Sequence, residues 1–227
     1  MRFHFLTIFP EIVESYLSEA MLARASDKRL AKFVVRNIRD YTKDKHKKTD
    51  DRPYGGGPGM VMTAQPILTA YDSLKLNLQK RKRQKVVMLS PSGILFTNAL
   101  AKQFAKRYDD VVFICGRYEG VDDRVRKILK TSEYSIGSFV LTGGELPALV
   151  MTDAIVRQIP GVLGKSESLE ETRTASPHVY TRPEVLVYKK KKYNVPEILI
   201  GGNHKQIELW RASQQKKSEK KPQSVEN

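Results

Sequence analysis

The sequence predicts an α/β fold with a largely parallel sheet, on three observations. Hydrophobic runs typical of buried strands alternate with segments whose apolar residues recur at helical spacing. Several of these runs end in glycine or proline turns, where open α/β sheets bind small ligands. Hydrophobic residues make up 40% of the 227, which is enough for a substantial core.

The first expected elements are a strand at residues 3–7, a helix that Pro10 opens and that reaches Met21, and a second strand at residues 33–38. Residues 50–60 read DDRPYGGGPGM, a composition that suits neither a helix nor an interior strand. We therefore expect a loop there. Its flanking Asp, Arg and Tyr favour a loop that wraps a ligand.

The alternation continues in the second half of the chain. We expect helices at residues 63–78, 97–108 and 145–159, a short charged helix after Gly120, and strands at 86–89, 111–115 and 139–141. Ser90-Pro91-Ser92-Gly93 reads as a turn. Together with the glycine turns in residues 115–147, it gives three strand-to-turn junctions. We interpret this part of the chain as the cofactor pocket.

Three regions follow from the composition. Residues 1–164 form the α/β domain, the polar residues 165–176 are a mobile linker, and residues 177–227 form a small C-terminal unit. Within that unit, the stretch from Ser213 onward is too polar to pack, and we expect it to be disordered.

The net charge of +15 and the pI of about 9.8 point to a polyanionic partner. Nucleic acid is the first choice and an acidic membrane surface the second, while the plainest alternative is a lysine-rich solvated surface. No run of 18 apolar residues exists, so we expect no membrane span. The short N-terminal hydrophobic patch, broken by Pro10-Glu11, is a poor signal peptide, and a cytoplasmic protein is expected.

Several common sites are disfavoured. No Gly-x-Gly-x-x-Gly follows the first strand, and neither a phosphate-binding Gly-Lys-Ser/Thr nor a Gly-x-Ser-x-Gly elbow occurs. The single Cys115 excludes an internal disulfide and a multi-cysteine metal site, and is expected in the core. His4, His46, His178 and His204 lie far apart, so no metal is expected. Each is taken as structural or exposed, and His46 among lysines is a candidate phosphate contact.

The motifs then become specific in combination. They are DDRPYGGGPGM at 50–60, GRYEG at 116–120, Ile136-Gly137 with Val140-Leu141, GGELP at 143–147, IPGVLG at 159–164, YTRPEV at 180–185 and Gly202-Asn203-His204. Together they closely resemble the TrmD family of bacterial tRNA (guanine-N1)-methyltransferases, of the SPOUT class. The resemblance runs from residue 1 to about residue 211.

This resemblance implies methyl transfer from S-adenosylmethionine to N1 of the guanine just 3′ of the anticodon, position 37. It also implies a mostly parallel sheet with helices on both faces, a small helical C-terminal domain, and a homodimer with the active site at the subunit interface. A deep trefoil knot comes only from the resemblance, because general rules of chain topology argue against threaded chains. A requirement for Mg²⁺ is left open.

The resemblance also assigns roles to residues. The cofactor-binding set is Ser90, Pro91, Gly116, Glu119, Ile136, Gly137, Ser138, Phe139, Val140, Leu141, Gly143 and Gly144, with Glu119 near the positive sulfonium. The substrate-binding set is Asp50, Arg52, Gly57 and Gly59. Arg157 would face guanine O6 and stabilise charge there. From the residues alone, Arg157 reads as a solvated arginine at a helix end.

Two features depart from the family pattern. The family's general base is a linker aspartate, whereas residues 169–173 read LEETR here. Glu171 takes its place with a one-residue gap and Thr172 without one. We favour Glu171, because a carboxylate accepts a proton readily, and leave Glu170 as the alternative. The C-terminal part is also shorter, so tRNA binding is expected to rely more on Lys216, Lys217, Lys220 and Lys221.

Two rival functions remain at this point. The first is a non-catalytic RNA-binding module that kept the fold, which the missing aspartate supports. The second is a related SPOUT enzyme that modifies ribosomal RNA or another tRNA position. The glycine loop at 50–60 argues against the second. A membrane-surface role has only the net charge behind it.

Overall fold

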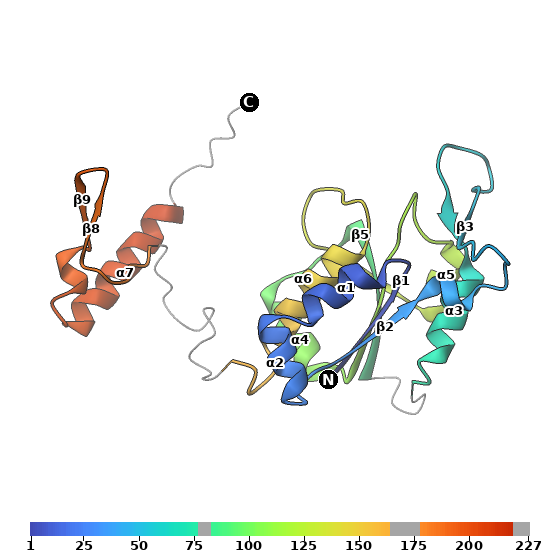
Figure 1. The fold of residues 1–227 in the computed structure, drawn as a ribbon, viewed down its shortest axis with the longest axis horizontal. Coiled ribbons are helices and arrows are strands. Elements are labelled where there is room, and N and C mark those ends of the chain that lie inside the picture. Colours follow the sequence, from blue (N-terminus) through green and yellow to red (C-terminus); the bar gives the residue numbers. More distant parts are fainter. Residues whose placement is uncertain (77–82, 164–177, 220–227) are drawn as a thin grey trace. The chain divides into compact units, whose positions relative to one another are not determined.

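The computed structural model describes residues 1–76, 83–163 and 178–219 (Figure 1). The chain divides into two compact units, Met1–Leu163 and Gly164–Asn227. Each unit is described by itself below. The linker expected at residues 165–176 lies outside the described residues.

The first unit is built on a five-stranded parallel sheet in the order β2-β1-β6-β5-β7. Its strands are β1 (Arg2–Thr7), β2 (Lys32–Asn37), β5 (Gln84–Leu95), β6 (Asp110–Ile114) and β7 (Ser132–Ser135). The central strands β1 and β6 are buried along almost their whole length. Both faces of a parallel sheet are normally covered, so β6 is a nearly continuous hydrophobic run and even the polar His4 and Thr7 of β1 are buried.

Helices cover both faces of this sheet (Figure 1), as the family resemblance implies. One face packs against α1 (Pro10–Leu17), α2 (Ala20–Asp27), α4 (Asn98–Arg107) and α6 (Glu145–Val156). The other packs against α3 (Ala64–Ser73), α5 (Asp123–Leu129) and the 3₁₀ helix η1 (Ile38–Tyr41). Alternate residues of each strand feed the two cores. Phe5 and Phe113 stack at 5.4 Å in the first, while Leu6 and Ile114 belong to the second.

Residues 50–60 form the loop that their composition predicts. The short strands β3 (Asp50–Asp51) and β4 (Val61–Met62) pair in antiparallel fashion on either side of it. Met62 also bridges to Val121, and its backbone N–H donates to the carbonyl of Gly120 at 2.9 Å. The loop is therefore anchored beside residues 116–120.

Two strand predictions are wrong in detail. Residues 139–141 are an exposed loop, and the strand of this region is β7, whose polar sequence SEYS hides it from a search for hydrophobic runs. β7 is anchored in the sheet because Tyr134 packs against Phe96 and Phe104. The strand expected at 86–89 extends to Leu95. The predicted turn at 90–93 is an irregularity within it, since both Leu89 and Ile94 are opposite Tyr134.

The helix predicted from Pro10 to Met21 is two helices. α1 ends where the Ser18 backbone N–H donates to the carbonyl of Glu14. Glu19 is then extended and Ala20 has a φ of 48°, so the chain turns before α2. The apolar spacing continues through this break, which explains why periodicity alone does not reveal it.

The second unit contains a hairpin of β8 (Val185–Tyr188) and β9 (Lys191–Asn194), the 3₁₀ helix η5 (Glu197–Leu199) and helix α7 (His204–Glu219). The hairpin is absent from the sequence prediction. The expectation of disorder from Ser213 onward is wrong as far as Glu219, because α7 continues to that residue. Lys220 and Lys221 lie outside the described residues. Within the described ranges, no helix is long and apolar enough to cross a membrane.

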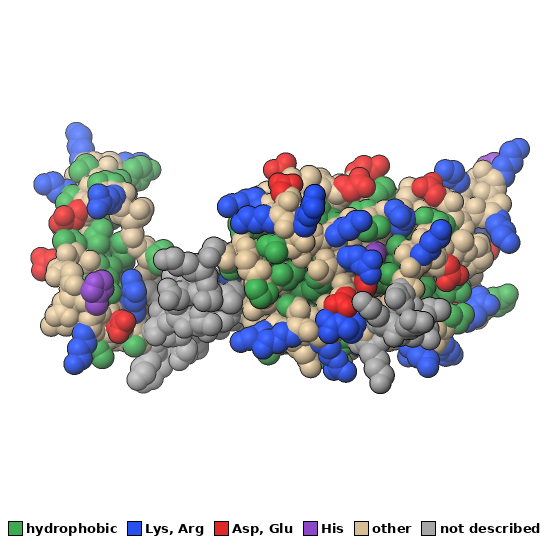
Figure 2. Space-filling view, turned by 90° about the horizontal axis from the view of Figure 1, so that it is seen from below, with side chains coloured by type: hydrophobic (Ala, Val, Ile, Leu, Met, Phe, Trp, Pro, Cys, Tyr) green, Lys and Arg blue, Asp and Glu red, His purple; other side chains and the backbone are tan. Residues whose placement is uncertain are grey.

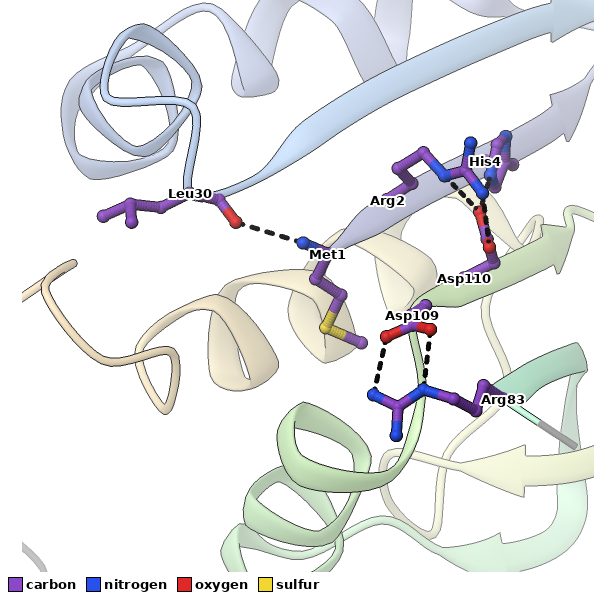
Figure 3. A network of polar contacts seen from close by, with 7 residues as sticks. All are labelled: Met1, Arg2, His4, Leu30, Arg83, Asp109 and Asp110. Carbon is purple, nitrogen blue, oxygen red and sulfur yellow. Dashed lines mark hydrogen bonds and ion pairs between the residues drawn. The ribbon is translucent and has the colours of Figure 1, made fainter. Parts of the chain in front are cut away.

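A polar network joins the N-terminal ends of the central strands (Figure 3). His4 Nε2 and Asp110 Oδ1 lie 2.8 Å apart, and Arg2 Nη2 donates to Asp110 Oδ2 at 2.8 Å. Burial lowers the pKa of His4 below its usual 6.5, an effect that the contact with Asp110 only partly offsets. His4 Nδ1 is buried without a hydrogen-bond partner. Burial, rather than the contact with Asp110, therefore favours the neutral imidazole.

This network predicts a loss of stability in mild acid. The unfolded chain binds a proton at His4 more readily than the folded chain does. The stability that neutral His4 contributes is therefore fully present above about pH 6.5. The free energy of unfolding should fall as the pH drops from about 6.5 toward the lower folded pKa. Urea denaturation at several pH values measures this. His4→Gln, whose amide reaches Asp110 but does not titrate, should flatten the dependence; an unchanged slope would contradict the assignment.

Candidate functional site

The candidate site is a cavity of about 400 Å³ beyond the ends of β6 and β7 and beside the irregularity of β5. It lies within the size range of small-molecule pockets. Three segments form most of its wall: residues 88–91, residues 116–121 and residues 133–144. The three strand-to-turn junctions predicted from the sequence therefore meet at one cavity.

The lining contains every expected cofactor-binding residue except Ser138. These are Ser90, Pro91, Gly116, Glu119, Ile136, Gly137, Phe139, Val140, Leu141, Gly143 and Gly144. Arg117, Tyr118, Tyr134 and Thr142 also line it and are absent from the prediction. Arg117 and Tyr118 lie inside the GRYEG motif, so that motif was the signal that could have found them. Nothing in the polar sequence around Tyr134 marks it as part of a pocket.

Gly144 allows the backbone to close the cavity tightly. Its N–H donates to the carbonyl of Gly116 at 2.9 Å. A Cβ on residue 144 would lie 2.8 Å from Cys115 Cα and 2.9 Å from Gly116 N, distances that real side chains do not reach. Only glycine brings the N-terminus of α6 this close to the end of β6.

A buried carboxylate organises the same corner. Glu145, the first residue of α6, is 1% exposed and accepts a 2.6 Å hydrogen bond from the Thr7 hydroxyl. Arg117 Nε donates to its other oxygen at 2.9 Å. The Arg117 guanidinium also lies 4.6 Å from the centroid of the Phe9 ring and donates to the carbonyl of Thr142 at 3.3 Å. Glu145 thus joins the ends of β1 and β6 to the loop before α6.

The glycine loop of residues 50–60 reaches the cavity through Gly59. A Cβ on residue 59, whose φ is +82°, would lie 2.6 Å from the side chain of Glu119. The Glu119 backbone N–H donates to the carbonyl of Met60 at 3.0 Å. Of the other expected substrate residues, Asp50 lies in β3, whereas Arg52 and Gly57 are exposed in the loop. The structure therefore places Gly59, but not the rest of this set, against a cavity residue.

The two expected catalytic residues do not line the cavity described here. Arg157 follows α6 as its C-terminal cap and is half-buried. Glu171, like Glu170 and Thr172, lies outside the described residues.

Cys115 and the four histidines do not line the cavity. Cys115 is fully buried in the core, and burial raises the pKa of its thiol well above the usual value, which fits the predicted core role. His4 is buried in the network of Figure 3, and His46, His178 and His204 are exposed. Over the part of the chain that the structure describes, no group of three or more His, Cys, Asp or Glu side chains is arranged to hold a metal ion.

The fold and cavity define a class: an α/β protein in which glycine-rich loops at the ends of parallel strands form a cavity of the size that suits a small ligand. Residues 1–224 match the sequence profile of the family described as tRNA (Guanine-1)-methyltransferase TrmD. The chain belongs to this family.

Curated relatives agree with the family match. The chain is 46% identical over 216 residues to a tRNA (guanine-N(1)-)-methyltransferase of Clostridioides difficile, covering 93% of this chain and 90% of the relative. It is 48% identical to the enzyme of that name from Caldicellulosiruptor saccharolyticus, over 94% and 85% of the two chains. For Geobacter metallireducens the identity is 46%, over 93% and 84%.

We predict that Glu145→Gln destabilises the first unit and loosens the cavity wall. An amide cannot accept from both Thr7 and Arg117 as the carboxylate does, and it leaves the poorly exposed guanidinium without its counter-charge. Removing one partner of a buried ion pair costs about 3 kcal/mol. Urea denaturation measures the loss, with Thr7→Ser as a control that keeps the hydroxyl. Unchanged stability would show that Glu145 does not hold this corner together.

Proposed function

We propose that this protein transfers a methyl group from S-adenosylmethionine to N1 of guanine at position 37 of tRNA. Membership of the TrmD family and the cavity formed by the expected cofactor residues support this proposal. In this proposal residues 1–164 hold the cofactor, residues 165–176 link the two parts, and residues 177–227 contact tRNA in the cytoplasm. The trefoil knot stays a prediction.

The residues around the cavity fit S-adenosylmethionine. Backbone groups of residues 136–144 can hold an adenine edge without side-chain bulk. A Cβ on residue 144 would meet the backbone of Cys115, and one on residue 143 would meet the Arg117 side chain. Apolar walls come from Phe139, Val140 and Leu141. The exposed carboxylate of Glu119 also lines the cavity and can face a positive sulfonium. When bound, the cofactor supplies an electrophilic methyl group.

The protein's own part of the reaction is to move one proton and stabilise one charge. The N1 proton of guanine must leave, and negative charge then spreads to O6. In the proposal Glu171 accepts the proton, and the Arg157 guanidinium, which is always charged, stabilises O6. The methylene that Glu has beyond Asp moves the carboxylate by about 1.5 Å, the length of a C–C bond. Displacements near 1 Å cost on the order of 10²-fold in rate, so we expect slow turnover unless the linker has adjusted.

A homodimer with the active site at the subunit interface is part of the proposal. Its support is a set of exposed apolar side chains in residues 139–150, of which Phe139 is 52% exposed and Val140 81% exposed. On α6, Leu146 is 56% and Val150 44% exposed. Groups of exposed apolar side chains of this kind mark interaction surfaces.

Mass spectrometry of tRNA after incubation with S-adenosylmethionine tests the activity. We expect 1-methylguanosine in tRNA with guanine at position 37 and none when adenine replaces it. Gly144→Ala should bind the cofactor more weakly in calorimetry, because its Cβ meets the backbone at Cys115. Methylation that survives the loss of guanine 37 would favour a SPOUT enzyme with another target. Cofactor binding without methylation of any RNA would favour the non-catalytic module.

We predict that Glu171→Gln abolishes single-turnover methylation and leaves the affinity for S-adenosylmethionine intact. The amide cannot take the N1 proton, whereas the cofactor contacts lie elsewhere. Rapid-quench assays and calorimetry measure the two quantities. Glu170→Gln is the matched control and should keep its activity. If Glu171→Gln is fully active, Glu170 or another group is the base.

A further inference from the structure

The β8–β9 hairpin of the second unit presents an unbroken row of lysines. Tyr188 is opposite Lys191, so Lys189 and Lys190 form a two-residue turn at its tip, and Lys192 follows in β9. The Val195 N–H donates to the carbonyl of Glu184 at 2.9 Å and closes the base of the hairpin. Every residue from Val185 to Asn194 is exposed, and none of them is acidic. The hairpin is thus a defined, basic projection.

The turn residues are poorly suited to the turn. Lys189 has a φ of 48° and Lys190 a φ of 63°, so both have the left-handed backbone of a type I′ hairpin. Asn-Gly is favoured at these positions because a Cβ is strained there. Lysine at both positions therefore has no explanation in the stability of the hairpin. Backbone strain of this kind is a reason to look for a functional role.

Two exposed tyrosines accompany the lysines. The Lys189 ammonium lies 5.4 Å from the centroid of the Tyr188 ring, and the Lys191 ammonium lies 5.6 Å from that of Tyr193. The rings are 59% and 48% exposed. Lysines that contact phosphate and aromatic rings that stack on unpaired bases are the combination found in proteins that bind single-stranded nucleic acid.

We propose that the β8–β9 hairpin binds the single-stranded loop of an RNA, with Lys189 and Lys190 on phosphates and Tyr188 and Tyr193 stacked on bases. The inference deepens the proposed function by naming the element that contacts tRNA, and rests on it only for the choice of RNA. β8 also exposes Val185, Leu186 and Val187, but the turn at the tip carries two charges and no apolar side chain, so we favour RNA over a bilayer. Lysine and arginine side chains also lie over much of the surface in Figure 2, so the test must separate the hairpin from general charge.

The decisive variant is Lys189→Asn/Lys190→Gly in the full chain. It installs the favoured turn residues, so the hairpin should be retained while two charges are removed. The control is Lys102→Gln/Lys106→Gln, which removes two exposed charges from α4. Fluorescence anisotropy with a labelled tRNA anticodon stem-loop measures affinity at several salt concentrations. We expect the hairpin variant to reduce the slope of log K against log salt by about 1.4, which is about 0.7 for each phosphate that a lysine no longer neutralises. The control should leave the slope unchanged.

The tyrosines provide the second arm. Tyr188→Leu and Tyr193→Leu should each weaken binding to the stem-loop about tenfold and leave a blunt duplex without a loop unaffected, because only unpaired bases stack on the rings. Unchanged stem-loop affinity in Lys189→Asn/Lys190→Gly would overturn the proposal. If that variant kept its RNA affinity and also lost binding to phosphatidylserine vesicles, the hairpin would be a membrane contact instead. Calorimetry with S-adenosylmethionine keeps the two ideas apart: a chain that binds RNA through the hairpin but takes up no cofactor retains this inference and loses the proposed function.

Discussion

The buried carboxylate of Glu145 holds together the end of the first unit where the cavity lies. Its two oxygens bind Thr7, after which β1 ends, and Arg117, just beyond β6, while its backbone begins α6. A charge this deeply buried persists only when it is paired and hydrogen-bonded. The three segments it joins are the ones that must keep a fixed separation for the cavity to exist. The loops of the pocket are therefore positioned by one side chain that does not itself line the cavity.

Main-chain packing sets the shape of that cavity. Gly144 touches the backbone of residues 115 and 116, and Gly93 would place a Cβ 2.6 Å from the Tyr134 backbone nitrogen. Such close packing leaves little freedom for substitution, but it also leaves peptide groups open to a ligand. The two segments that we propose contact RNA are built differently. The loop at 50–60 and the β8–β9 hairpin are largely exposed, and both carry charged and aromatic side chains, among glycines and prolines in the loop and aliphatic residues in the hairpin. The cavity wall and the proposed RNA contacts thus rely on different kinds of local structure.

The sequence predicted the α/β class and the strand-to-turn junctions that meet at the cavity, because both rest on local patterns. The two-sided helix layers and the individual residues assigned to the cofactor came from the family resemblance. Runs such as residues 111–115 are too hydrophobic for a surface, and glycine turns mark strand ends. The failures have physical causes. Residues 139–141 are as hydrophobic as a strand but form an exposed loop. The polar sequence SEYS forms β7 because Tyr134 packs against Phe104, a contact between residues distant in the sequence. The β8–β9 hairpin escaped because its turn carries two lysines in place of the usual Asn-Gly. Strand order, set entirely by distant pairings, has no local signal.

The position of β1 has a consequence for how the chain is made. β1 is synthesised before β6 and sits between β2 and β6, and Arg2 pairs with both Lys32 and Asp110. One of the two hydrogen-bonding edges of β1 therefore stays unpaired until β6 has been synthesised. During that interval Phe3 and Phe5 lack the β6 side of their core, which includes Phe113. Sheets closed by such distant partners assemble slowly, and nascent chains with an open hydrophobic edge are the kind that chaperones shield. Helices α1 and α2, made immediately after β1, can give early cover to one face of this strand.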